Sequence, residues 1–165
     1  MAGRLRPVLG GLGFMLLGGP TIVAGLVPWL ITRWQGDDQP LGLRLLGAAL
    51  LAVGGLLVVE TTARFALQGR GTPAPWAPPE RFVARGSYRA SRNPMYVGVL
   101  ALIVGQGFLL GRESLFAWAA AAWLIFHLFV VFHEERGLRR RFGADYEDYS
   151  RRVGRWLPGL IRRNR

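Results

Sequence analysis

Four long apolar runs constrain what this chain can fold into more than any other feature. They cover residues 7–31, 41–67, 95–111 and 115–132. Crossing a bilayer takes about 20 mostly apolar residues in a helix, and a helix satisfies its own backbone polar groups where water is absent. We therefore expect an all-α integral membrane protein, with four transmembrane helices in a single domain over residues 1–165.

Arginine is distributed unevenly around these runs. The net charge is +11, and the chain contains no lysine, so this charge comes from arginine. The arginines gather before the first run, between the second and third, and after the fourth, whereas the short loop 34–40 carries Asp37 and Asp38. The positive-inside rule then places both termini in the cytoplasm. Because the arginines flank apolar runs, we expect the bilayer, and no nucleic acid, as a partner.

The chain contains no cysteine. Disulfides, cysteine–zinc sites and cysteine nucleophiles are therefore excluded. Residues 133–136 read His-Glu-Glu-Arg and lack the second ligand, one helical turn further on, that a helical zinc site uses. We expect no metal site here.

A first motif, Arg-Asn-Pro-Met-Tyr-Val-Gly, occupies residues 92–98 at the start of the third run. Pro94 suits the first position of a helix, and Asn93 before it suits the N-cap. The same geometry also allows a binding role. A helix N-terminus offers free N–H groups, while Tyr88 and Tyr96 offer aromatic faces to an adenine or a sulfonium. Both interpretations remain open from the residues alone.

A second motif follows the fourth run, with the pattern E-E-x-x-L-x-x-x-F-G-x-x-Y-x-x-Y over residues 134–149. Glu134 and Glu135 are adjacent carboxylates at the membrane boundary. One interpretation is ion pairing with arginines three to five positions further along the helix. Beyond Gly143, residues 144–153 are predicted to form a short amphipathic helix at the cytoplasmic face, which serves either as an anchor or as a lid.

Three further ionisable residues lie inside the apolar runs. Glu60 and Arg64 are spaced i, i+4, which predicts an ion pair within one helix, although charged groups in a membrane helix also often mark function. His127 lies about two turns before Glu134 on a similar face. It either packs while donating to a backbone carbonyl or reaches the same cavity as Glu134.

The order of the two motifs, with two apolar stretches between them, resembles the isoprenylcysteine carboxyl methyltransferase family of integral membrane enzymes, which is related to the phospholipid methyltransferases. The resemblance covers roughly residues 71–158 and looks like a bacterial, minimal four-span branch, which implies an inner-membrane location. It implies S-adenosyl-L-methionine as the cofactor, held by segments 71–98 and 134–158. The residues that it nominates are Tyr88, Asn93, Pro94, Met95, Tyr96, Glu134 and, by loop position alone, Phe82 and Val83.

In this family, a carboxylate like Glu134 pairs with the ammonium of the cofactor. Eukaryotic members also carry an arginine about one turn before it, but Val130 stands at that position here. The catalytic residues are therefore unassigned, and the candidates for substrate contact are Arg92, Glu60, Arg64 and His127.

The resemblance predicts an S-adenosylmethionine-dependent methyltransferase that acts on a lipid or lipophilic acceptor within the membrane. Three alternatives remain at this stage. The protein could be a phospholipid amine N-methyltransferase, a non-catalytic lipid-binding membrane protein, or a relative of the NADPH-dependent reductases. The sequence does not identify the acceptor or the oligomeric state.

Overall fold

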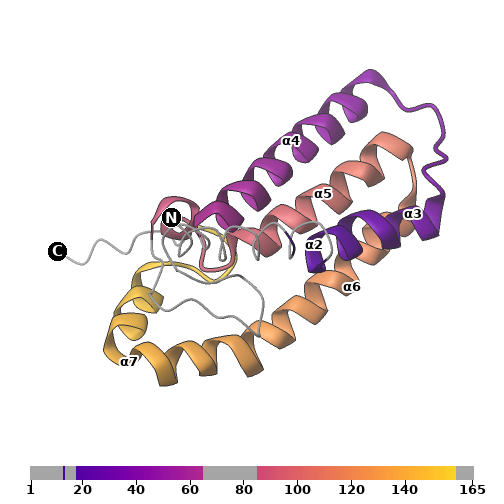
Figure 1. The fold of residues 1–165 in the computed structure, drawn as a ribbon. Helices are drawn as coiled ribbons and strands as arrows, with labels where there is room; N and C mark the ends of the chain where they lie inside the picture. The colour runs from indigo at the N-terminus through magenta and orange to yellow at the C-terminus, as the bar shows by residue number, and fades with distance from the viewer. Residues whose placement is uncertain (1–12, 14–17, 65–84, 159–165) are drawn as a thin grey trace.

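The computed structural model describes residue 13, residues 18–64 and residues 85–158 (Figure 1). Within these ranges the chain forms helices and no β-strand. In chain order, the elements are α2 (Gly19–Thr21), the π-helical η1 (Ile22–Leu26), α3 (Val27–Thr32), α4 (Leu41–Arg64), the 3₁₀-helical η3 (Gly86–Arg89), α5 (Pro94–Leu110), α6 (Glu113–Phe129), the π-helical η4 (Val130–Glu134) and α7 (Glu135–Arg152).

Helices α4 and α5 pack side by side and antiparallel, and glycine lets their backbones approach closely (Figure 1). A Cβ atom at Gly54 would lie 2.7 Å from the carbonyl oxygen of Gly98, and one at Gly47 would lie 2.7 Å from that of Gly105. Each helix carries its two glycines seven residues apart, which is nearly two turns and keeps them on one face. Small residues at such a contact are typical of membrane helix pairs.

Helix α6 continues through η4 into α7 without leaving the helical path until Gly143, where φ is 50° and ψ is −124°. This left-handed backbone suits glycine, which has no Cβ to clash. The second half of α7 then turns back beneath the bundle (Figure 1). The helix predicted over residues 144–153 is present up to Arg152, and the structure extends helical geometry back to Glu135.

Each predicted span coincides with a helix in the described part of the chain. The helices α4 and Glu113–Arg152 are long and apolar enough to cross a membrane, and only 17% and 22% of their most apolar windows are buried. Such low burial does not fit the core helix of a soluble protein. The helices Gly19–Thr32 and Pro94–Leu110 are shorter. Residues 7–12, 14–17 and 65–67 of the predicted spans lie outside the described residues.

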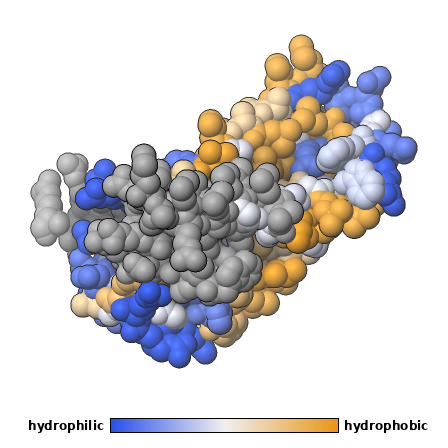
Figure 2. Space-filling model, in the orientation of Figure 1, coloured by the Kyte–Doolittle hydropathy of each residue, from blue (hydrophilic) through white to orange (hydrophobic). Residues whose placement is uncertain are grey.

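The surface is apolar along the helices and hydrophilic at both ends (Figure 2). Large apolar side chains are exposed on α4 and α6, among them Leu45, Leu56, Leu124 and Ile125. At one end, the two short loops meet, because Asp37 pairs with Arg112 at 3.6 Å and its N–H donates to the carbonyl of Leu110. Both sequence motifs lie at the other end.

Candidate functional site

The two motifs meet through a direct side-chain contact. The hydroxyl of Tyr96, in the first turn of α5, donates to Oε2 of Glu134 at 3.2 Å. Glu134 is the last residue of η4, just beyond the apolar run that ends at Phe132. Segments 38 residues apart in the sequence are thus joined at one end of the bundle.

Glu134 has no cationic partner among the described residues. Burial raises the pKa of its carboxyl, the charge of Glu135 adds to that rise, and the hydrogen bond from Tyr96 opposes it. The ion pairs with the following arginines, considered from the sequence, are not formed. A half-buried carboxylate without a counter-charge has the chemistry to accept an ammonium group.

Glu135 points to a different set of partners. Arg155 donates to its two oxygens at 2.7 and 3.1 Å, and Arg92 donates to Oε1 at 3.0 Å. Burial acts to raise the pKa of Glu135, but the hydrogen bonds from Arg155 and the charge of Arg92 outweigh it and lower the pKa. Arg92, the first residue of the first motif, is therefore engaged in an ion pair that holds the C-terminal segment.

Asn93 is buried and precedes Pro94 at the first position of α5, as predicted. Its side chain, however, makes no capping hydrogen bond to the helix. Instead Nδ2 donates to the carbonyl of Arg155 at 3.0 Å, and the hydroxyl of Ser91 donates to the same oxygen at 3.2 Å. Asn93 therefore occupies the N-cap position that the sequence indicated, but its side chain bonds to the C-terminal segment and not to the first turn of α5.

Tyr88 lies in η3 and is buried, with 8% of its surface exposed. The hydroxyl of Tyr149 donates to its backbone carbonyl at 2.6 Å. Its neighbour Ser87 bonds to Glu60 at the end of α4, and Glu60 also forms the predicted ion pair with Arg64. The loop that carries Tyr88 is thus held by both α4 and α7.

An aromatic cluster of Tyr96, Trp123, Phe126, His127 and Trp156 lies beside these residues. The ring of Tyr96 is 4.6 Å from that of Phe126, and His127 stacks on Trp156 at 6.1 Å. The indole N–H of Trp156 donates to Nδ1 of His127 at 3.2 Å. The structure thus gives His127 a side-chain partner, Trp156, that the sequence did not indicate.

The structure brings most of the nominated residues to one end of the bundle. Tyr88, Asn93, Pro94, Met95, Tyr96 and Glu134 all lie there, while Phe82 and Val83 lie outside the described residues. Sequence reasoning missed Ser87, Phe126 and Arg155. Only Phe126 carried a signal, since it lies four residues, about one helical turn, before Val130 on the helix that leads to Glu134.

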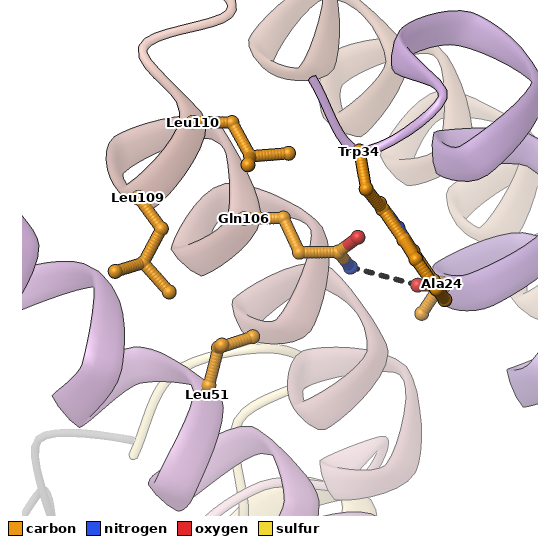
Figure 3. Close-up of a pocket in the computed structure, with 6 residues that line it drawn as sticks. All are labelled: Ala24, Trp34, Leu51, Gln106, Leu109 and Leu110. Atoms are coloured by element: carbon orange, nitrogen blue, oxygen red, sulfur yellow. Dashed lines mark hydrogen bonds between the residues drawn. The ribbon is translucent and has the colours of Figure 1, made fainter. Parts of the chain in front are cut away.

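The described residues also line a separate, open hollow of about 290 Å³ among η1, α4, α5 and Trp34, which follows α3 (Figure 3). Its walls are apolar except for Gln106, whose amide donates to the carbonyl of Ala24 at 2.7 Å. Because Leu109 and Leu110 line it, this hollow lies at the opposite end of α5 from Tyr96.

Comparisons with known proteins identify a family and several relatives by sequence. The family described as phospholipid methyltransferase matches residues 43–145. Methanethiol S-methyltransferase 2 of Bradyrhizobium diazoefficiens is 36% identical over 47% of this chain and 29% of its own length. Protein-S-isoprenylcysteine O-methyltransferase B of Arabidopsis thaliana is 34% identical over 47% of this chain and 40% of its own length.

A third relative, the nickel-cobalt-cadmium resistance protein NccN of Alcaligenes xylosoxydans xylosoxydans, is 29% identical over 82% of this chain and 60% of its own length. The chain thus spans less than two thirds of the length of each of these relatives. No solved structure gives a significant match.

Proposed function

Because this chain belongs to the phospholipid methyltransferase family, we propose that it is an S-adenosyl-L-methionine-dependent methyltransferase for an acceptor embedded in the membrane. Members of this family use S-adenosyl-L-methionine. The resemblance to isoprenylcysteine methyltransferases, drawn from the two motifs, is confirmed by relatives that carry that name. The observation that carries the proposal is the contact between Tyr96 and Glu134, which unites both motifs.

The residues at this end fit the cofactor. A carboxylate without a cationic partner in the described structure suits the cofactor's ammonium, and the faces of Tyr88 and Tyr96 suit its sulfonium or its adenine. We assign Glu134 to the ammonium, and Asn93, Pro94 and Met95 to the wall of the same site. Phe82 and Val83 belong to this assignment by their loop position. The bound cofactor supplies an electrophilic methyl group, and the protein aligns the acceptor and excludes water.

We further propose that all four helical segments cross the bilayer and that both termini are cytoplasmic, in a bacterial inner membrane. Helix α5 has 17 residues, a length of about 25 Å, which is close to a hydrocarbon core of about 30 Å. The pairing of the two short loops through Asp37 and Arg112 supports their location on the same side. The arginine-rich segments then share the other side.

The acceptor is more consistent with an amine than with a carboxylate. A carboxylate acceptor would need a cation at the site. Arg92 is paired with Glu135, Arg64 is paired with Glu60, and the family's arginine position is the buried Val130, 1% exposed. Arg89, in η3, has no ion pair among the described residues and is a cation left for a carboxylate. We therefore propose a phospholipid amine as the first acceptor to test, with an isoprenylcysteine carboxyl as the alternative.

An amine must lose a proton before or during methylation. His127 is the histidine of the aromatic cluster, but its Nδ1 already accepts the indole hydrogen of Trp156. His127 therefore positions Trp156 in this structure, and proton acceptance by Nδ1 requires that this bond break. Glu60 and Arg64 also bond to each other, so neither has a demonstrated role toward substrate.

The test is methyl transfer from methyl-tritiated S-adenosylmethionine to bacterial lipids by the purified protein in vesicles. After mild alkali, a methylated amine keeps its label in a non-volatile product, whereas a methyl ester releases the label as volatile methanol. The proposal expects the non-volatile label. A lack of transfer together with NADPH-dependent reduction of a lipid would favour the reductase alternative, and a lack of both would favour the lipid-binding alternative.

A further inference from the structure

The carboxylate of Glu60 connects helix α4 to the loop that carries Tyr88. Its Oε2 accepts the hydroxyl hydrogen of Ser87 at 2.5 Å, and its Oε1 accepts the backbone N–H of Ser87 at 3.4 Å. Oε1 also accepts from Nε of Arg64, one turn further along α4. Both oxygens are therefore used within the protein, and Ser87 is 27 residues away in the sequence.

The backbone beside Ser87 is shaped to fit this contact. Gly86 has a φ of 65°, in the left-handed region that favours glycine. A Cβ atom at this position would also collide with the guanidinium of Arg64. Arg64 thus has two roles: it pairs with Glu60, and its side chain forms the wall against which the loop turns.

The residue after Ser87 is Tyr88, which is buried and which we assigned above to the cofactor site. Its carbonyl accepts the hydroxyl of Tyr149 at 2.6 Å. The 3₁₀ turn Gly86–Arg89 is consequently held from α4 on one side, through Ser87, and from α7 on the other. A shift of Ser87 relative to α4 moves Tyr88 with it, since the two residues are adjacent in one short turn.

We propose that Glu60 is a positioning residue, which acts through Ser87 to fix Tyr88 in the cofactor site. The inference rests on the proposed function, because it takes Tyr88 as a cofactor residue. It assigns Glu60 and Arg64 to the placement of the loop and not to contact with the acceptor.

The simpler interpretation is an ion pair that only stabilises its own helix. Asp148 and Arg152 show what such a pair looks like: they are also spaced i, i+4, at 2.8 Å, and both are exposed. Within the described residues, the carboxylate of Asp148 pairs with Arg151 and Arg152 of its own helix. Glu60 differs, because two of its three hydrogen bonds come from Ser87, outside its own helix. The third comes from Arg64, whose guanidinium also lies against Gly86.

The experiment measures S-adenosylhomocysteine binding by calorimetry for the wild type, Glu60→Gln, Ser87→Ala and the double variant, with Asp148→Asn as the matched control. Each single change is expected to weaken binding about tenfold, the size expected for the loss of a hydrogen bond to a charged group. The double variant should bind no more weakly than the weaker single variant, since both changes break one connection. Asp148→Asn should bind like the wild type.

A second readout needs no cofactor. Hydrogen–deuterium exchange at residues 86–90 should be faster in Glu60→Gln than in the wild type, and unchanged in Asp148→Asn. Two results would overturn the positioning role and leave the proposed function intact, provided that the wild type binds. One is that the effects of Glu60→Gln and Ser87→Ala on binding are additive, and the other is that Glu60→Gln leaves the exchange at residues 86–90 unchanged. Failure of the folded wild type to bind would instead overturn the proposed function, and faster exchange in Glu60→Gln would still establish the link from Glu60 to the loop.

Discussion

The hydroxyl of Tyr96 donates a hydrogen bond of 3.2 Å to the carboxylate of Glu134. This contact ties the first turn of α5 to the end of the long apolar helix formed by α6 and η4. It places an aromatic ring and an acid without a cationic partner, among the described residues, at the same end of the bundle. The proposed cofactor site is organised around this pair.

Tyr96→Phe should weaken cofactor binding about fivefold while leaving the fold intact. The change removes one hydroxyl, and a single hydrogen bond contributes about 1 kcal/mol, whereas the ring keeps its contact with Phe126 at 4.6 Å. Calorimetric titration with S-adenosylhomocysteine measures the effect. Unchanged affinity would mean that the hydroxyl does not orient Glu134 for the ligand.

Glu135→Gln should destabilise the protein by about 2 kcal/mol at pH 7, since it leaves two arginine side chains without their carboxylate. The thermal midpoint in detergent reports the loss. The folded fraction of Glu135→Gln should still bind the cofactor through Glu134, because the two carboxylates have separate partners.

The same carboxylate predicts a pH dependence. The folded-state pKa of Glu135 is lowered from its ordinary value of 4.5 by its arginine partners. A depressed pKa contributes stability that is complete above the unfolded-state value and is lost as the pH falls through the folded-state value. The difference in thermal midpoint between wild type and Glu135→Gln should therefore be constant from pH 7 to about pH 5.5 and shrink below about pH 4.5. A difference that grows as the pH falls would contradict this assignment.

Gly54→Ala should destabilise the α4–α5 pair, while Gly55→Ala should not. A Cβ at Gly54 meets the carbonyl oxygen of Gly98 at 2.7 Å, whereas one at Gly55 has nothing within 4 Å. Overpacking of this kind costs about 1–3 kcal/mol, and alanine otherwise favours a helix over glycine. Thermal midpoints of the two variants in one detergent give the comparison. Equal thermal midpoints for the two variants would show that α4 and α5 can move apart at Gly54 without a loss of stability.

Much of the fold could be predicted from the apolar runs, because a helix of membrane length has a strong compositional signal. The helix starts and ends also followed from local chemistry, as at Pro94 and at Gly111, whose φ of 63° ends α5. The glycine pairs across α4 and α5 were not predictable as pairs. Which glycine faces which depends on the axial position of α4 relative to α5, and the spacing of glycines within each helix does not define that position.

The candidate site was only partly predictable for the same reason. Tyr96 and Glu134 were identified by motif, and Glu60 and Arg64 by their i, i+4 spacing. The partners of Asn93 and His127 were not predicted, because both bond to the C-terminal segment, at Arg155 and Trp156. No local pattern indicates that residues 62 and 29 positions away supply these partners.

The most direct test of the central claim is calorimetric titration of S-adenosylhomocysteine into the detergent-purified protein, beside Glu134→Ala. Glu113→Ala is the matched control, since Glu113 begins α6 at the end of the bundle away from the motifs. The proposed site predicts binding by the wild type and by Glu113→Ala, and its loss in Glu134→Ala. Wild-type protein that is folded but does not bind, or Glu134→Ala that binds as tightly as the wild type, would contradict it.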